Sequence, residues 1–434
     1  MILAAGEGLR LNPLTLSRPK HLIPIGGKPL LEHILLSIKE AGFKEALIVV
    51  HHMAERLKSY FGDGSKVGLK LDYVYQTEIK GTADATYAAK SYVDDEFLLI
   101  YGDLYITPKT IETVIKGHEK TRSAVTISVV PVDRPEQYGI VDLEGSHAIS
   151  IIEKPKSERT KSNMANAGIY IFQPNIFEIL EQTPTSPRGE KEITDSLRMI
   201  IRDKNSIAAV QISSEEWIDV GRPWNILDAN RQSLTLFNKS KIDGQVEDNV
   251  HLLGPVVIGK KTRIRSGVYI EGPVFIDEEC DIGPNCYLRP NTSIGKRVRI
   301  GNSCEIKNSI ILDRTAIGHL SYVGDSFIGE DCNLGAGTIT ANYRFDGKTI
   351  QMLLKDEIVD SRRMKLGVFM GDGVKTGINT LIMPGVKIGP NSWIGPNIVL
   401  TKDTSSNTLL LLKQRMIEQK RVENHNYRSN DQNK

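Results

Sequence analysis

The first 225 residues alternate helix-like and strand-like segments. Apolar residues recur at helical spacing from Leu30 to Ile38, and Gly42 follows as a helix stop. Short apolar runs at 46–50 and 97–100 have the length and composition of strands, and 71–75 alternates as a half-buried strand does. This βαβα alternation predicts an α/β domain of the Rossmann-like class, with a mostly parallel sheet covered by helices on both faces.

The second half follows a period of six. Ile or Leu occupies every sixth position at Leu252, Ile258, Ile264, Ile270, Ile276, Ile282, Leu288, Ile294, Ile300, Ile306 and Leu312. Neither the helix nor the strand period produces this spacing, which is the hexapeptide repeat of a left-handed parallel β-helix. After 312 we expect the register to slip to Ile317 and Val323 and the period to return at 382–400. Residues 342–363 break the period and predict a loop that projects from the coils.

These two patterns divide the chain into four parts. We expect an α/β domain at 1–225, a linker at 226–250, a β-helix at 251–408 and a polar tail at 409–434. The tail is rich in Asn and charged residues, a composition that favours disorder after at most a short helix.

Composition and charge exclude several classes of protein. The 434 residues include 55 Lys and Arg against 53 Asp and Glu, a net charge of +2, so no basic surface for nucleic acid is indicated. The apolar runs are too short to cross a membrane, and no signal sequence opens the chain, so we expect a cytoplasmic protein. The four cysteines lack CxxC spacing, which disfavours a zinc site or a disulfide framework.

A glycine-rich segment follows the first short strand. Gly6 and Gly8 allow the backbone to approach a phosphate or a base closely. Position 11 is Leu rather than the third Gly of a dinucleotide fingerprint, and the chain has no P-loop motif. Arg10 and Lys20, ten residues apart and flanking one loop, could clamp a triphosphate.

The segment from Leu3 to Pro29 resembles the signature of the sugar-1-phosphate nucleotidylyltransferases. Later motifs follow in that family's order: Gln76, Gly81-Thr82, Tyr101-Gly102-Asp103, Tyr138-Gly139-Ile140, Glu153-Lys154-Pro155, Asn166-Ala167-Gly168 and Trp217-Ile218-Asp219. One departure is the first strand, which is shorter than is usual in the family.

The resemblance implies a role for each matching residue. Arg10 and Lys20 would bind phosphates and act in catalysis, and Asp103 and Asp219 would hold Mg²⁺. The nucleotide would be bound by Leu3, Ala5, Gly6, Gly8, Gln76, Gly81 and Thr82, and the sugar phosphate by Gly139, Glu153, Lys154 and Asn166. Attack of one phosphate on another brings like charges together, so cations and positioning supply most of the catalysis.

A second group of motifs lies in the β-helix, at 318–325, 333–338 and 341–343. It resembles the acetyltransferase half of the bifunctional enzymes that make UDP-N-acetylglucosamine, and their archaeal relatives. The resemblance implies that His319 is the general base, because an imidazole can take up a proton near neutral pH. Arg289 and Lys307 would bind the substrate phosphate. The amino sugar and acetyl-CoA would contact Tyr322, Asn333, Ala336, Asn342 and Tyr343.

Four interpretations follow. The first is a bifunctional enzyme, by its family a homotrimer, that acetylates glucosamine or galactosamine 1-phosphate. It would also join UTP or dTTP to a sugar 1-phosphate, either N-acetylglucosamine or glucose 1-phosphate. The second is a nucleotidylyltransferase whose β-helix only assembles or regulates. The third is a scaffold protein without activity, which the presence of Arg10, Lys20, Asp103 and Asp219 disfavours. The fourth is a β-helix carbonic anhydrase, which needs three metal-binding histidines, whereas residues 251–408 contain only two histidines. The sequence leaves the base and the sugar open.

Overall fold

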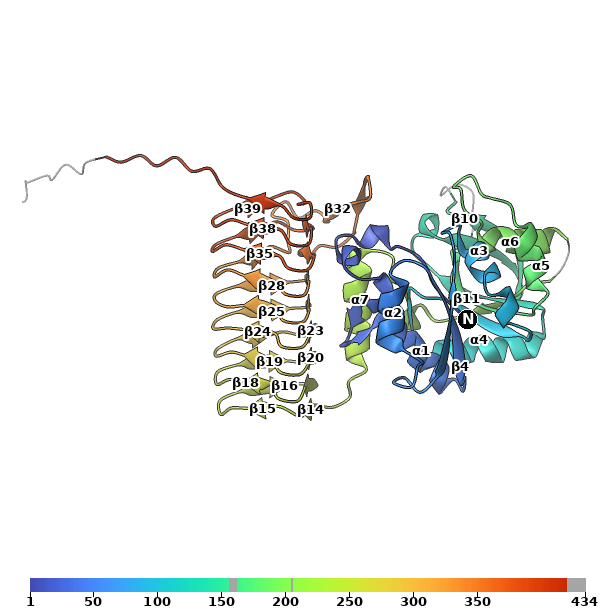
Figure 1. Cartoon of the computed structure of the whole chain (residues 1–434), viewed down its shortest axis with the longest axis horizontal. Helices are drawn as coiled ribbons and strands as arrows, with labels where there is room; N and C mark the ends of the chain where they lie inside the picture. The colour runs from blue at the N-terminus through green and yellow to red at the C-terminus, as the bar shows by residue number, and fades with distance from the viewer. Residues whose placement is uncertain (156–161, 204–205, 420–434) are drawn as a thin grey trace, which may run out of the picture.

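The computed structural model describes residues 1–155, 162–203 and 206–419. An α/β domain and a stack of β-coils lie side by side, with helix α7 (Pro223–Thr235) between them (Figure 1). No helix in these described ranges is long and apolar enough to cross a membrane.

A nine-stranded sheet forms the centre of the α/β domain. Its strands, in spatial order, are β5 (Lys70–Tyr75), β4 (Glu45–Val50), β1 (Ile2–Ala4), β6 (Phe97–Tyr101), β11 (Met164–Phe172), β8 (Val125–Pro131), β12 (Ala208–Gln211), β10 (His147–Glu153) and β9 (Gly139–Glu144). The first four are parallel, as predicted, but β11 is antiparallel to both β6 and β8. The sheet is therefore mixed rather than mostly parallel, because the second half of the domain returns through hairpin-like pairings such as β9–β10.

Helices cover both faces of this sheet, as predicted. One apolar cluster joins it to α1 (Leu30–Glu40), α2 (Ala54–Phe61) and α4 (Pro108–Thr121). A second cluster joins it to α3 (Thr82–Tyr87), α5 (Ile176–Gln182) and α6 (Ile193–Arg202). A short ladder of β7 (Leu104–Ile106) and β13 (Trp217–Asp219) lies beside the sheet. The predicted Rossmann-like class is confirmed.

The second domain is the predicted left-handed parallel β-helix, with three faces. The first face contains β14 (Lys241–Ile242), β17 (Val256–Ile258), β20 (Val274–Ile276), β23 (Thr292–Ile294), β26 (Ile310–Ile311), β29 (Phe327–Ile328), β34 (Phe369–Met370) and β37 (Lys387–Ile388). The second contains β15 (Gln245–Val246), β18 (Arg263–Ile264), β21 (Asp281–Ile282), β24 (Arg299–Ile300), β27 (Ala316–Ile317), β30 (Asn333–Leu334), β35 (Lys375–Thr376), β38 (Trp393–Ile394) and β40 (Leu409–Leu410). The third contains β16 (His251–Leu253), β19 (Tyr269–Glu271), β22 (Tyr287–Leu288), β25 (Glu305–Lys307), β28 (Tyr322–Gly324), β31 (Ile339–Thr340), β36 (Leu381–Ile382) and β39 (Val399–Leu400).

The hexapeptide register slips earlier than predicted. Ile294 pairs with Ile311, so Ile311 rather than Leu312 occupies the core position of its coil. The side chain of Leu312 packs instead against the α/β domain. The slip therefore lies before 311, and it turns an apolar residue of the first face toward the neighbouring domain. The four cysteines are unpaired and buried.

The predicted linker at 226–250 is ordered and belongs to both domains. It contains most of helix α7 and then strands β14 and β15, so the first β-coil begins before 251. Asn230 of α7 accepts hydrogen bonds from the Gly26 N–H at 2.9 Å and the Ser293 hydroxyl at 2.7 Å, and it donates one to the Asn291 carbonyl at 2.9 Å. This segment was not recognised because its apolar residues bury against two different domains.

An apolar cluster joins the two domains. It contains Leu11, Leu14, Ile23, Ile25, Leu30, Tyr105, Val220, Trp224, Ile226, Leu227 and Ala229 from the α/β domain and α7, and Ile310, Leu312, Phe327, Ile350, Met352, Leu354, Leu366 and Phe369 from the β-helix. Burial of apolar surface is the main favourable term in such an association. The junction is therefore a continuous core that fixes one domain against the other.

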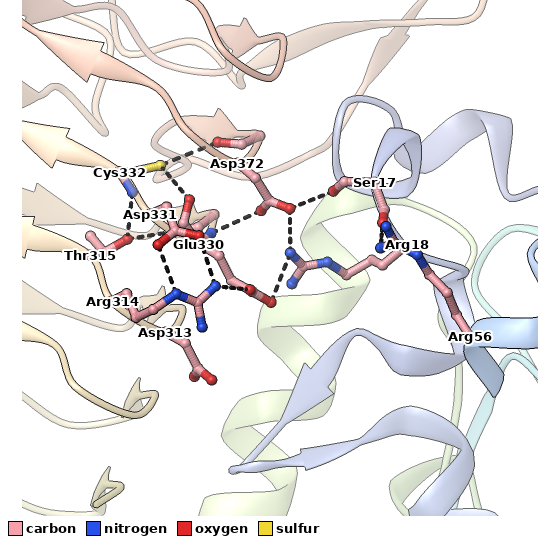
Figure 2. Close-up of polar contacts among 12 residues, drawn as sticks. Ser17, Arg18, Arg56, Asp313, Arg314, Thr315, Glu330, Asp331, Cys332 and Asp372 are labelled. Atoms are coloured by element: carbon pink, nitrogen blue, oxygen red, sulfur yellow. Dashed lines mark hydrogen bonds and ion pairs between the residues drawn. The ribbon is translucent and has the colours of Figure 1, made fainter. Parts of the chain in front are cut away.

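Polar contacts at the rim of the junction involve the predicted signature loop. The Arg18 guanidinium lies 2.5 Å from the Asp372 carboxylate and 3.1 Å from that of Glu330, and the Ser17 hydroxyl donates to Asp372 at 2.6 Å (Figure 2). Asp372 also accepts a hydrogen bond from the Glu330 N–H at 2.8 Å. Two acids of the β-helix thus hold a loop of the other domain.

The predicted loop at 342–363 is an antiparallel hairpin. Its strands are β32 (Gln351–Leu354) and β33 (Glu357–Asp360), with Lys355 and Asp356 at the tip. The hairpin leaves the stack of coils on the side of the α/β domain (Figure 1), and Met352 and Leu354 are buried in the junction cluster.

Candidate active sites

A cavity of about 490 Å³ opens beside the carboxyl ends of β1 and β6. Ligands of α/β sheets characteristically bind at this edge. All the residues predicted for nucleotidyl transfer line it: Leu3, Ala5, Gly6, Gly8, Arg10, Lys20, Gln76, Gly81, Thr82, Asp103, Gly139, Glu153, Lys154, Asn166 and Asp219. Residues that are spread over more than two hundred positions of the sequence therefore meet in one cavity of the structure.

The glycine-rich loop is shaped by Gly8. Its φ of 71° lies in the left-handed region, and a Cβ there would be 3.2 Å from carbon atoms of both Lys20 and Thr15. Gly8 caps the short 3₁₀ helix Leu9–Leu11 that carries Arg10, and the Thr15 hydroxyl donates to the Gly8 carbonyl at 3.0 Å. The loop thereby folds back so that Arg10 and Lys20 face one cavity.

Two carboxylates lie at the base of the cavity. Asp219 is paired with Leu104 in the β7–β13 ladder, and the Val220 N–H donates to the Asp103 carbonyl at 2.9 Å, so Asp103 and Asp219 are neighbours. The Lys20 ammonium lies 2.5 Å from the Asp103 carboxylate. Burial raises the pKa of Asp103, but the Lys20 charge and hydrogen bond outweigh it and hold the pKa below its usual value. Burial, followed by the Asp103 charge, raises the pKa of Asp219.

This carboxylate pair fits a magnesium ion. Hard divalent cations prefer carboxylate oxygen, and Mg²⁺ is commonly bound by one or two carboxylates together with substrate phosphates. Burial is the main cause of the raised pKa of Asp219, and a bound cation would relieve the smaller contribution, the repulsion from Asp103. No cluster of three or more His, Cys, Asp or Glu side chains was found in the described parts of the chain, so the protein would supply only part of the coordination.

His21 follows Lys20 in the chain and is fully buried. Neither of its ring nitrogens has a hydrogen-bond partner within the described residues. Burial, with a smaller contribution from the Lys20 charge, lowers the pKa of His21 to about 3. The ring is therefore neutral and fills space behind the carboxylates.

The side of the cavity assigned to the nucleotide is built on β5 and α3. The buried Gln76 amide donates to the Asp84 carboxylate at 2.8 Å and to the Gly81 carbonyl at 3.3 Å. Gly81 has a φ of 107°, and a Cβ there would lie 2.3 Å from the Lys191 carbonyl oxygen. Thr82 accepts a hydrogen bond from the Ile193 N–H at 3.0 Å. These contacts fix the start of α3 against the start of α6.

The side assigned to the sugar phosphate is held by a polar network. Glu153 lies 3.2 Å from the Arg188 guanidinium, which also pairs with Glu192. The Asn166 amide donates to the Tyr170 hydroxyl at 2.7 Å. Burial, followed by repulsion from Arg188, lowers the pKa of Lys154.

Sequence reasoning missed several residues of this cavity. Arg188 and Glu192 lie in a charged segment before α6 that gave no family motif, and only their spatial pairing with Glu153 reveals them. Lys355 lines the cavity although it belongs to the β-helix domain. No sequence pattern around Lys355 predicts this position, because the contact between the hairpin and the α/β domain depends on the whole fold.

The second predicted site is partly assembled. On the third face of the β-helix, buried Asp325 accepts hydrogen bonds from Lys307 at 3.0 Å and from Asn342. Asn342 also donates to the Tyr322 hydroxyl at 3.0 Å. Arg289, one residue beyond β22, is paired with Glu305 at 2.9 Å. Lys307, Tyr322 and Asn342 therefore form one cluster with Arg289 on an adjacent coil.

The other predicted residues of this site lie around that cluster. His319 is exposed in the turn between β27 and β28, and Asn333 is exposed at the start of β30 on the second face. Ala336 accepts a backbone hydrogen bond from Asn379, and Tyr343 is half-exposed near the base of the hairpin. Within the described residues, none of their side chains is hydrogen-bonded to Asp325 or Tyr322.

Comparison with known proteins covers both domains. Residues 1–235 match the nucleotidyl transferase family, and residues 270–364 match the GMPPB C-terminal domain. The chain is 42% identical to "Bifunctional protein GlmU" of Methanocaldococcus jannaschii over 97% of this chain and 99% of the relative. It is 45% identical to a protein of the same name from Methanococcus maripaludis, over 96% and 98%.

A third relative extends the likeness to another archaeal group. The chain is 42% identical to "Bifunctional sugar-1-phosphate nucleotidylyltransferase/acetyltransferase" of Sulfurisphaera tokodaii, over 93% of this chain and 97% of the relative. These matches span both predicted sites and confirm the resemblance stated from the motifs. The chain belongs to the family of bifunctional sugar-1-phosphate nucleotidylyltransferase/acetyltransferases.

Proposed function

We propose that the protein acetylates an amino-sugar 1-phosphate with acetyl-CoA and joins a sugar 1-phosphate to a nucleoside triphosphate. The amino sugar is glucosamine or galactosamine, and the nucleotide is UTP or dTTP. The sugar 1-phosphate that accepts the nucleotide is either N-acetylglucosamine 1-phosphate or glucose 1-phosphate. The proposal is carried by one observation: all the residues assigned to nucleotidyl transfer line one cavity. Relatives that match over nearly the full chain support it.

In nucleotidyl transfer, an oxygen of the sugar phosphate attacks the α-phosphorus and pyrophosphate leaves. Arg10 and Lys20 reduce the repulsion between the two anions and stabilise the charge that develops on the phosphates. Mg²⁺ would be held by Asp103 and Asp219 and would neutralise further phosphate charge. Lys154 and Asn166 orient the attacking sugar phosphate, and the rigid loop around Gly81 positions the base.

In acetyl transfer, the amine of the sugar attacks the thioester carbonyl and coenzyme A leaves as a thiol. His319 takes the proton that the amine must lose. Arg289 and Lys307 bind the substrate phosphate, Tyr322 and Asn342 orient the amino sugar, and Asn333, Ala336 and Tyr343 contact acetyl-CoA or the acceptor. The monofunctional alternative is disfavoured because the bifunctional relatives include the β-helix in their match.

The assembly we propose is a homotrimer formed by the β-helices. Exposed apolar side chains follow the third face at Leu253, Tyr269, Leu381 and Val399. They form two pairs on neighbouring strands, one at each end of this face. Exposed apolar side chains of this kind are suited to an interface, and a prism with flat faces favours closed cyclic symmetry.

A substrate panel tests the proposed function. The purified protein is incubated with UTP or dTTP and each sugar 1-phosphate with Mg²⁺, and pyrophosphate is measured. In parallel, each amino-sugar 1-phosphate is incubated with acetyl-CoA, and the free thiol is measured. We expect at least one pair to turn over in each assay. Pyrophosphate release without any thiol release would favour the monofunctional alternative.

A further inference from the structure

The hairpin at the tip of the β-helix loop carries Lys355 to the nucleotidyl cavity. Lys355 lines that cavity together with Arg10 and Asp219, although it lies more than a hundred residues beyond the α/β domain. The cavity is thus built from both domains. Nothing in the motif pattern assigns this residue a role.

The hairpin is anchored rather than free. Met352 and Leu354 are buried in the junction cluster, and the Ile350 N–H donates to the Arg363 carbonyl at 2.9 Å at the base. The Leu353 carbonyl accepts a hydrogen bond from Lys387. A side chain at the tip therefore starts from a fixed backbone, which lowers the entropy cost of binding a ligand.

A shared apolar core links the hairpin to the segments that carry two of the cavity residues. Leu354, its immediate neighbour, lies in the same apolar cluster as Leu11 and Val220. These two residues directly follow Arg10 and Asp219 in the chain. The hairpin that carries Lys355 is therefore packed into the core that also contains the residues following Arg10 and Asp219, and Lys355 lines the same cavity as these two side chains.

The charges of the cavity give this lysine a function. Lys20 is paired with Asp103, and Arg188 is paired with Glu153 and Glu192. Among the cavity cations that the structure describes, Arg10, Lys154 and Lys355 make no ion pair with a protein acid. A triphosphate and a sugar phosphate bring several negative charges, and unpaired cations can bind them without first breaking a protein contact.

We propose that Lys355 is a phosphate-binding residue of the nucleotidyl site, which contacts the β- and γ-phosphates of the triphosphate beside Arg10. The inference rests on the proposed nucleotidyl transfer. The same two phosphates leave as pyrophosphate, so Lys355 binds both the substrate and this product. The β-helix domain thereby supplies a residue to the reaction of the other domain.

Kinetics of the full-length protein separate the possible contacts. Lys355→Ala should raise the KM for the triphosphate and, in the reverse reaction, the KM for pyrophosphate by roughly 5- to 30-fold, as for one charge-assisted hydrogen bond. The KM for the sugar 1-phosphate should change less than about twofold, and Lys355→Arg should restore most of the loss. Lys348→Ala is the control: it removes an exposed lysine of the same 342–363 loop that does not line the cavity, and it should leave these constants unchanged.

Binding measured by calorimetry tests the residue independently of turnover. Inorganic pyrophosphate with Mg²⁺ should bind Lys355→Ala more weakly than the unaltered protein, while the two unfold at the same temperature. Equal pyrophosphate affinity in both proteins, or an effect on the sugar 1-phosphate alone, would overturn the assignment of Lys355. Absence of nucleotidyl turnover in the unaltered protein would overturn the proposed function instead, and the calorimetric comparison would still decide on Lys355.

Discussion

Arg10 and Lys20 face the same cavity but differ in their electrostatic surroundings. Lys20 is held 2.5 Å from Asp103, whereas Arg10 makes no ion pair in the described parts of the chain. Arg10 lies near Gly221 and Asp219, since a Cβ at Gly221 would be 3.1 Å from its guanidinium. Arg10 is thus more available to the phosphates than Lys20, which the Asp103 carboxylate keeps in place.

This difference makes Arg10 the sharper test of nucleotidyl transfer. Arg10→Ala should lower kcat for pyrophosphate release by about 10²–10³-fold, because it removes charge stabilisation that is strongest in the transition state. Acetyl transfer, measured as thiol release, should stay within about twofold of the unaltered protein. Lys116→Ala, an exposed cation of α4, is the matched control. Near-normal pyrophosphate release from the Arg10 variant would contradict the proposal that Arg10 binds the phosphates.

In the proposed acetyl transfer, His319 is the residue whose loss should affect the rate most. His319→Ala should lower thiol release by about 10²–10⁴-fold, the usual contribution of a general base. The KM for the amino sugar should change less, because Arg289 and Lys307 remain. His251→Ala alters the exposed histidine of β16, which packs near Tyr269, and should have no such effect. A His319 variant that acetylates at the normal rate would show that another group takes the proton.

At the scale of the elements, the junction ties the signature loop to the β-helix. Arg18 is nearly buried, with 9% of its side chain exposed, and Asp372 supplies its shortest contact. Asp372→Asn should lower the free energy of unfolding by about 1–3 kcal/mol, because a buried charge loses part of its compensation. It should also raise the KM for the triphosphate several-fold, since Lys20 lies two residues from Arg18.

The neighbouring pair of Arg314 and Asp331 provides the control for this effect. It lies on the same stretch of coils but is more exposed, and exposed ion pairs contribute at most about 1 kcal/mol. Asp331→Asn should therefore change both quantities little. Urea unfolding and triphosphate kinetics measured on both variants decide the question. Equal, small effects of the two substitutions would contradict the proposed dependence of the Arg18 loop on Asp372.

Some elements could be predicted from sequence because one local pattern determines them. The helical spacing at 30–38 and the hexapeptide positions from 258 to 306 depend only on which side chains face a single core. Leu312, helix α7 and the 351–360 hairpin were missed or misplaced because their apolar side chains pack against a second domain. No local period signals such a contact.

The same distinction, between local sequence patterns and contacts that depend on the tertiary structure, applies to the candidate sites. The nucleotidyl residues could be recognised because each lies in a short family motif and the sheet brings the motifs to one edge. Arg188 and Lys355 belong to segments without such motifs, so only the tertiary structure places them. In the β-helix, the Asp325 contacts join residues of adjacent coils, and their spacing of 17 or 18 positions is visible in the sequence only once the coil length is known.

At the scale of the whole molecule, the buried His21 and the partly buried His33 link stability to pH. Burial lowers the pKa of His21 to about 3 and that of His33 to about 4, against an ordinary 6.5. Below pH 6.5 the unfolded chain binds protons that the folded protein does not. Their contribution is therefore complete above pH 6.5 and is lost as the pH falls toward 4, by up to about 1.4 kcal/mol per pH unit for each ring.

Urea unfolding at pH 7.5, 6 and 5 measures this loss. His21→Leu should flatten the pH dependence, since neither ring nitrogen of His21 has a partner to lose. His147→Ala, at an exposed position of β10, is the control and should keep the slope of the unaltered protein. An unchanged slope in His21→Leu would mean that other groups cause the acid sensitivity.

In the proposed trimer, three chains associate through their β-helices. Light scattering at micromolar concentration should give a mass three times that of the 48.3 kDa chain. Replacing the exposed apolar residues Leu253 and Leu381 of the third face by Lys should shift the protein toward the monomer, because charge would enter a buried interface. A monomeric mass for the unaltered protein would contradict this arrangement.

Mixing two single variants tests most directly whether one chain carries two separate transferase sites. Arg10→Ala and His319→Ala are each supplied with glucosamine 1-phosphate, acetyl-CoA, UTP and Mg²⁺, singly and together, and the nucleotide-linked N-acetyl sugar is measured. Each variant alone should form little, whereas the mixture should form it readily, because one variant acetylates and the other transfers the nucleotide. If either variant loses both reactions, or if two variants that each retain one reaction fail to complement each other, the account of two independent sites is contradicted.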